Sequence, residues 1–408
     1  MTTAKPSLLE IPSTPYEHKR LLPLEATRGY AAIVVVITHF LLAFSPITSG
    51  LLPQARTAES QVGHWYYFLL NGTGAVIFFF TLSGFVLCWP YFKSENKQQL
   101  VKAFLKRWPR LAGPVLVTTL LSYLLFKFDL YFFEPASLII PGPWLADFGC
   151  PTPYCESGWV HQFQPSLFDA ITKGLTTFFT GNTNYNTNLW TMQIEFVGSI
   201  VVFCLAAFLA LILSFNFLLA SFIIFATWSL SFFPYLFPFI CGIHLAACCI
   251  KYQPKVRKLN AIILIIIGLY LLSYLISEKD YHWLSYIYFP SLIQKNLHII
   301  INSFGSILII FSIMANRSIY DLMDGRLSAY LGKLSFPLYL VHTIIICSLS
   351  SYVFIFFNQV GQTHAWILTQ TFLITLTASV AVSSLVIYFD EWWLKKINYI
   401  VENLTSPK

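Results

Sequence analysis

An arginine and a histidine frame one apolar stretch near the start of the chain. In "EATRGYAAIVVVITHF", residues 25–40, Arg28 and His39 are separated by ten mostly apolar residues. A helix advances about 16 Å and turns three times plus about 20° over this spacing, so both side chains would share one face. Ionisable groups at membrane depth normally face a protein interior or a water-filled cavity. The pair predicts a polar site; the alternative is a snorkelling boundary arginine and a buried structural histidine.

Two later apolar segments carry ionisable residues at similar predicted depth. Glu195 lies in "NLWTMQIEFVGSI", about six residues into its segment, and His342 lies in "LGKLSFPLYLVHTIII". Tyr339 and Ser335 precede His342 by three and seven residues, so the three share a helix face. A carboxylate near an imidazole could orient the ring and hold it ready as a general base, so we expect Glu195 to orient His39. The alternatives are an interfacial carboxylate and a hydrogen bond that only packs helices.

Two further motifs have the residue types that bind a ligand. In "LKRWPR", Arg107 and Arg110 are suited to a bidentate grip on phosphate. The alternative is that inner loops are basic in any case, because they face anionic lipid. In "GAVIFFFTLSGFVLCW", the hydroxyl of Ser83 could contact a ligand, whereas Ser83 and Gly84 could equally serve close helix packing.

The elements that must position these residues are membrane helices. The 408 residues are 56% hydrophobic and 11% charged, with a mean hydropathy of +0.66, and a soluble chain carries roughly twice that charge. Several apolar runs approach the ~20 residues that cross a bilayer. The sequence therefore predicts an all-α, polytopic membrane protein with about ten spans, at 27–46, 66–90, 111–133, 189–213, 215–232, 234–250, 259–276, 297–315, 334–357 and 365–389. The joint at "SFFPYLFPF" is also compatible with a re-entrant hairpin.

The basic residues predict the orientation. With ten spans, 20 of the 25 Lys and Arg residues fall on the side of the termini. The other five, which fall on the opposite side or near it, are Arg56, Lys127, Lys173, Lys279 and Lys295. The positive-inside rule makes both termini cytosolic. We expect cytosolic tails at 1–22 and 391–408, one membrane domain at 23–390, and a place in the plasma membrane.

The long outer loop between the third and fourth spans holds two cysteines. Cys150 and Cys155 lie in "GCPTPYCESGW", and an oxidising compartment favours a disulfide between them over two free thiols. They lack the further ligands of a zinc site, and we expect no metal. The same loop contains "SLFDAITKGLTTFFTG", an amphipathic stretch that could lie along the interface.

Taken in order, these motifs resemble one family over residues 22–390, the acyltransferase-3 family of integral membrane acyltransferases. The matching stretches are "RGYAAIVVVITHF", "FFFTLSGFVL", "RWPR", "LWTMQIEF" and "LGKLSFPLYLVH". Two places depart from the family pattern. The usual Asp-Gly-Leu-Arg-Gly opening is Glu25-Ala26-Thr27-Arg28-Gly29 here, and Phe196 and Val197 follow Glu195 where a second polar residue is common.

The resemblance implies an enzyme that transfers an acyl group, usually acetyl, from acyl-CoA to a hydroxyl of a cell-envelope or secreted glycan. Its co-substrate would be acetyl-CoA or another acyl-CoA, its acceptor a glycan or glycolipid, and no nucleic acid is expected. Catalytic roles would fall to His39 and Glu195, and donor binding to Arg28, Ser83, Arg107, Arg110, Ser335, Tyr339 and His342.

Two other classes of protein remain open at this stage. A secondary transporter of a small anionic or sugar-like solute would also place ionisable residues at membrane depth. It typically has broken helices at corresponding positions of two halves, and only "FFPYLFPF" is of that kind. A non-catalytic scaffold or sensor would not need Arg28 and His39 on one face.

Overall fold

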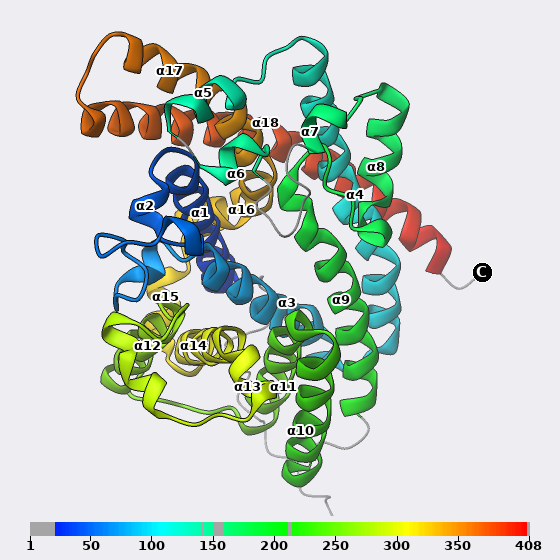
Figure 1. Ribbon diagram of the computed structural model, residues 1–408. Coiled ribbons are helices and arrows are strands. Elements are labelled where there is room, and N and C mark those ends of the chain that lie inside the picture. The colour runs from blue at the N-terminus through cyan, green and yellow to red at the C-terminus, as the bar shows by residue number, and fades with distance from the viewer. Residues whose placement is uncertain (1–20, 141, 150–158, 211–213, 406–408) are drawn as a thin grey trace, which may run out of the picture.

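The chain folds into a bundle of long helices, with the short helices α5, α6 and α7 near one another at the top of Figure 1. A computed structural model describes residues 21–140, 142–149, 159–210 and 214–405. Within these ranges every regular element is a helix. The α-helices are α1 Leu22–Phe44, α2 Pro46–Ser49, α3 Gly72–Ser94, α4 Lys97–Lys127, α5 Phe133–Ile139, α6 Pro143–Ala146, α7 Trp159–Gln162, α8 Leu167–Thr180, α9 Trp190–Leu209, α10 Phe215–Phe232, α11 Phe237–Tyr252, α12 Lys258–Leu272, α13 Ser291–Lys295, α14 Leu297–Ala315, α15 Arg317–Met323, α16 Arg326–Ile345, α17 Ser351–Gln359 and α18 His364–Thr405.

Short 3₁₀ segments and one π-helical segment complete the elements of the described chain. The 3₁₀ segments are Pro53–Ala55, Tyr67–Leu69, Thr187–Leu189, Pro234–Leu236 and Lys279–Tyr286. The π-helical segment Ile346–Ser350 joins α16 to α17 without a break. Such segments are common at functional sites, and this one begins four residues after His342.

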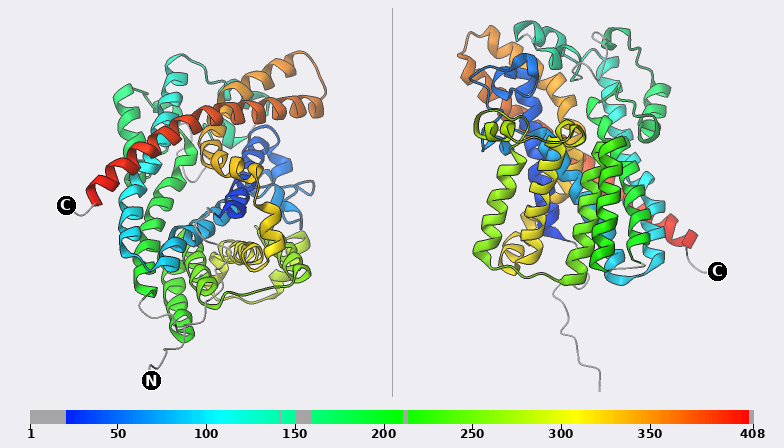
Figure 2. Two further views of the ribbon diagram at one scale, coloured as in Figure 1. Left: turned by 180° about the vertical axis from the view of Figure 1, so that it is seen from behind. Right: turned by 60° about the horizontal axis from the view of Figure 1, so that its bottom comes forward.

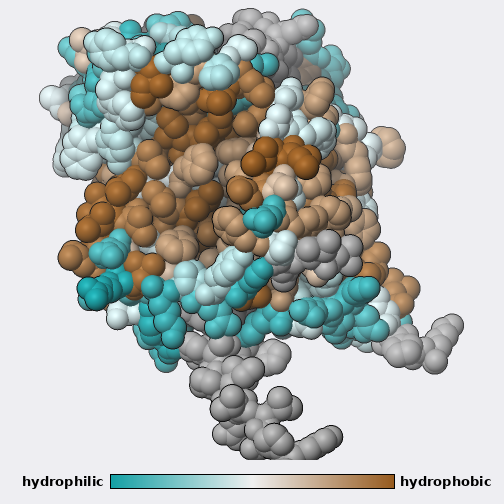
Figure 3. All heavy atoms as spheres, turned by 90° about the horizontal axis from the view of Figure 1, so that it is seen from below, coloured by the Kyte–Doolittle hydropathy of each residue, from teal (hydrophilic) through white to brown (hydrophobic). Residues whose placement is uncertain are grey.

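The prediction of an all-helical membrane protein is confirmed. In the described residues, nine helical segments are long and apolar enough to cross a membrane, and each matches one predicted span. The remaining prediction, 259–276, coincides with the shorter apolar helix α12. This helix ends at Leu272, and the hydroxyl of Ser273, the residue that follows, contacts the carbonyl oxygens of Trp65 and Leu269. Side by side, the long helices present a broad hydrophobic band with hydrophilic residues at both ends (Figure 3).

Glycines let the central helices approach closely. A Cβ on Gly84 of α3 would lie 2.3 Å from the carbonyl oxygen of Phe239, and one on Gly242 of α11 would lie 2.0 Å from that of Thr81. The sequence interpretation of Gly84 as a packing residue is thus confirmed. In α1, a Cβ on Gly29 would clash with Leu331 of α16. Such crossings bring neighbouring backbones into contact, and they fix the rotation of α1 and α3 toward the interior.

The ends of the chain differ from the expected boundaries. Helix α1 has its centre near Ile33, because it begins at Leu22 rather than at 27. His39 lies six residues, about 9 Å, beyond that centre, away from the Arg28 end. The predicted N-terminal tail is almost wholly outside the described residues, as is the whole Cys150–Cys155 pair.

The C-terminal segment is a single helix of 42 residues that crosses the bundle obliquely (Figure 2). At about 63 Å it is twice the thickness of a hydrocarbon core. Residues 391–405, predicted as a tail, continue this helix and pack on α4. The indole of Trp393 covers Gly113 and donates a hydrogen bond of 2.7 Å to the carbonyl oxygen of Pro109. The segment thereby becomes part of the wall around the site.

Candidate active site

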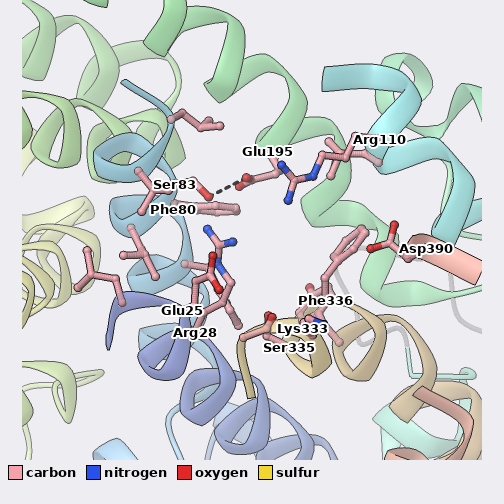
Figure 4. A pocket seen from close by; sticks show the side chains of 18 of the residues that line it. Glu25, Arg28, Phe80, Ser83, Arg110, Glu195, Lys333, Ser335, Phe336 and Asp390 are labelled. Carbon is pink, nitrogen blue, oxygen red and sulfur yellow. Dashed lines mark hydrogen bonds between the residues drawn. The ribbon is translucent and has the colours of Figure 1, made fainter. Parts of the chain in front are cut away.

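A cavity of about 420 Å³ lies between α1, α3, α4, α9, α16 and α18. Charged and aromatic side chains from these helices point into it (Figure 4). The structure brings seven of the nine predicted site residues into its lining: Arg28, Ser83, Arg107, Arg110, Glu195, Ser335 and Tyr339. The other two, His39 and His342, lie together just beyond one end of it.

Glu195 joins three helices through one carboxylate oxygen. The guanidinium of Arg107 donates to Oε1 of Glu195 and also, through Nε, to the hydroxyl of Ser199 at 2.8 Å. The hydroxyl of Ser83 donates to the same Oε1 at 2.7 Å. The ion pair is nearly buried, with the side chains of Arg107 and Glu195 only 9% and 14% exposed. Buried charges need such hydrogen-bonded partners, so this network fixes α3, α4 and α9 around the cavity.

Arg28 has a different environment in the same cavity. Its guanidinium reaches into the space from α1, close to Glu25 (Figure 4). Although the side chain is half-buried, it makes no hydrogen bond within the described part of the chain. A planar cation with unused donors is suited to a phosphate or carboxylate ligand. Arg28 is therefore better placed than Arg107 to bind an anion.

His39 and His342 form a hydrogen-bonded pair from α1 and α16. Nδ1 of His39 lies 2.7 Å from Nε2 of His342, and Nδ1 of His342 lies 3.0 Å from the carbonyl oxygen of Leu338. A carbonyl can only accept, so Nδ1 of His342 carries the proton and, in the neutral ring, its Nε2 accepts. Nδ1 of His39 must then donate, which leaves Nε2 of His39 as a free base.

The ring of His39 has a neighbour on one face and another at its Nδ1 edge. One face stacks on Trp144 of α6, at 5.2 Å between ring centroids, and the ring of His342 lies edge to edge with it through the Nδ1–Nε2 hydrogen bond, at 5.0 Å between centroids and 16° between ring planes. The carboxylate of Glu195, which we expected to orient His39, is engaged by Arg107 and Ser83 instead. Orientation of His39 comes from His342, and Asn188 supports that ring by a further contact of 3.2 Å to its Nε2.

Tyr339 lies beside both the cavity and the histidine pair. Its ring lines the cavity and lies 5.9 Å from that of His342, one helical turn away. The hydroxyl accepts a hydrogen bond from Thr191 at 2.9 Å and donates to the carbonyl oxygen of Asn188 at 3.2 Å.

Sequence reasoning missed several residues of the site. The cavity also has Glu25, Lys333, Asp390 and Glu391 in its wall, and Trp144 and Asn188 surround the histidines. A signal existed for Lys333, within the "LGKLSF" motif, and for Asn188, within the polar run "NTNYNTN" that precedes α9. No signal existed for Trp144, because its contact with His39 depends on how a distant loop folds back.

Comparison with known proteins identifies the family. The model of the acyltransferase-3 family, described as an acyltransferase domain, matches residues 23–388. The chain belongs to this family. The resemblance inferred from the motifs is thus confirmed, and the protein is a membrane acyltransferase rather than a transporter or a scaffold. No curated protein and no solved structure matches the chain.

Proposed function

We propose that this acyltransferase moves an acyl group, in the simplest case acetyl, from cytosolic acyl-CoA to a hydroxyl of a cell-envelope or secreted glycan at the plasma membrane. The observation that carries the proposal is the order of groups along α1. An arginine with unused donors points into a cavity, and a histidine with a free Nε2 lies about 16 Å further along the helix. Family membership indicates the class of reaction. The order along α1 indicates that the polar end of the acyl donor would lie at Arg28 and its thioester end at His39.

The cavity would hold the donor. Arg28 and Arg110 would bind its phosphates, while Arg107, held by Glu195, would contribute its remaining donors. Ser335 and Tyr339 of α16 would line the path of the pantetheine arm, and the ring of Tyr339 would turn aside to admit the thioester. The role left to Glu195 is to position Arg107 and Ser83.

At the histidine pair, Nε2 of His39 would take the proton of the acceptor hydroxyl as its oxygen attacks the thioester carbonyl. A new C–O bond forms, the C–S bond breaks, and the proton passes from His39 to the leaving thiolate. His342 acts as a positioning residue that keeps the proton of His39 on Nδ1. General base catalysis of this kind contributes typically 10²–10⁴ in rate.

The test uses purified protein in nanodiscs with radiolabelled acetyl-CoA and a glycan acceptor. The acceptor would first be identified by mass spectrometry of envelope glycans with and without the gene. We expect His39→Ala to lower acetyl transfer at least a hundredfold and His298→Ala, an intramembrane histidine outside the site, to leave it unchanged. Wild-type rates in purified His39→Ala would refute the base assignment.

A further inference from the structure

A second cavity of about 420 Å³ adjoins the first. It lies between α3, α4 and α18, and Tyr91, Gln99, Lys102, Lys106 and Asn398 are among its lining residues. The two cavities share four wall residues: Leu87, Arg107, Arg110 and Leu394. One elongated ligand could therefore occupy both, with the two arginines beside its middle.

The charge of the second cavity is of one sign. Gln99, Lys102, Lys106 and Arg110 follow one another on one face of α4 and all line the second cavity. Among the described residues, no carboxylate lines it. By contrast, the first cavity has Glu25, Glu195, Asp390 and Glu391 in its wall. Like charges four residues apart on a helix destabilise it, and an anion bound in the cavity would offset this repulsion.

The two lysines of this row lack protein partners. Lys102 and Lys106 are half-buried, and neither makes a hydrogen bond or an ion pair with any residue that the structure describes. The positive-inside bias accounts for lysines near the inner surface, and the exposed Lys97 at the start of the same helix is of that kind. That bias does not account for two lysines that line a cavity next to the candidate active site.

We propose that the second cavity binds the phosphate-bearing nucleotide end of the acyl donor, while the first holds its thioester arm. The inference rests on the proposed function and assigns Lys102 and Lys106 as donor-binding residues. Lysine is a flexible point charge that suits phosphate groups, with Arg110 beside them for a planar grip. The phosphates next to the arm would then lie at Arg110 and Arg28, and the uncharged arm would continue from there toward Tyr339 in the first cavity.

The experiment compares two donors with the double variant Lys102→Gln/Lys106→Gln. Acetyl-CoA has both the nucleotide and the arm, whereas S-acetylpantetheine has only the arm. We expect the dissociation constant of acetyl-CoA to rise roughly ten- to a hundredfold in the double variant, and that of S-acetylpantetheine to change less than twofold. The matched control Lys97→Gln removes one exposed charge from the same helix and should bind both donors as the wild type does.

Three other results would overturn the assignment of Lys102 and Lys106 as donor-binding residues. Equal losses for both donors, or a loss as large in Lys97→Gln, would mean that the lysines act only through structure or general charge. Repeating the titrations in nanodiscs with and without anionic phospholipid separates the second source of phosphate. A response to the lipid alone would make the cavity a headgroup site. If the wild type binds acetyl-CoA no more tightly than S-acetylpantetheine, the nucleotide contributes nothing to binding and the inference alone is refuted. If the wild type binds neither donor, the proposed function is refuted as well.

Discussion

Replacing Glu195 by glutamine should cost far more unfolding free energy than the same change in an exposed ion pair. Glutamine keeps the size of the side chain but removes the charge that Arg107 and Ser83 contact. Arg107 then remains nearly buried without a counter-charge, and Arg28 lines the same cavity with a second positive charge. The loss is thus one of charge balance rather than of packing.

The magnitude follows from the burial of the pair. Removing one partner of a buried ion pair costs about 3–5 kcal/mol. We expect the lower end, about 3 kcal/mol, because the cavity admits water. Asp321→Asn is the matched control: its pair with Arg317 has side chains 50% and 60% exposed, and pairs of this kind contribute about 0.3–0.5 kcal/mol.

The assay is unfolding by SDS in mixed micelles, followed by tryptophan fluorescence. The double variant Arg107→Gln/Glu195→Gln should lose less than the sum of the two single losses, by about 1–3 kcal/mol, since the second change no longer strands a charge. A cost for Glu195→Gln as small as that of Asp321→Asn would refute the reasoning. So would additive losses in the double variant.

Three further outcomes follow from the packing and the histidine pair. Gly242→Ala should cost about 1–3 kcal/mol of unfolding free energy in the same assay, because the added Cβ would clash with the backbone of α3. Gly325→Ala is the control and should be neutral, since no atom lies within 4 Å of a Cβ added there. His342→Phe should lower acetyl transfer at least tenfold, since Nδ1 of His39 loses its hydrogen-bond acceptor. His342→Gln, whose amide oxygen can accept that hydrogen bond, should retain part of the rate. Equal rates in the two variants would contradict the tautomer argument. Trp393→Phe should cost about 0.5–1.5 kcal/mol through its lost hydrogen bond, and an unchanged midpoint would show that this end of α18 is not anchored.

Periodicity and composition were enough to predict the helical elements and one face of each. Arg28 and His39 share a face of α1, and Ser335, Tyr339 and His342 share a face of α16, because residue spacing within one helix determines direction. The motifs were enough to predict seven residues that now line one cavity. Helix ends were less predictable: α1 begins earlier and α18 ends later than hydropathy indicates, since caps and contacts with neighbours decide where a helix stops.

Which faces meet was decided only in the tertiary structure. Spacing along the chain says nothing about the rotation and sliding of one helix against another, and these depend on close crossings such as those at Gly29 and Gly84. In the packed structure Glu195 pairs with Arg107, and His39 is hydrogen-bonded to His342. Predicted depth in the membrane had suggested instead a contact between Glu195 and His39. The sequence by itself therefore determined the groups and the helix faces that carry them, and packing between helices determined their partners.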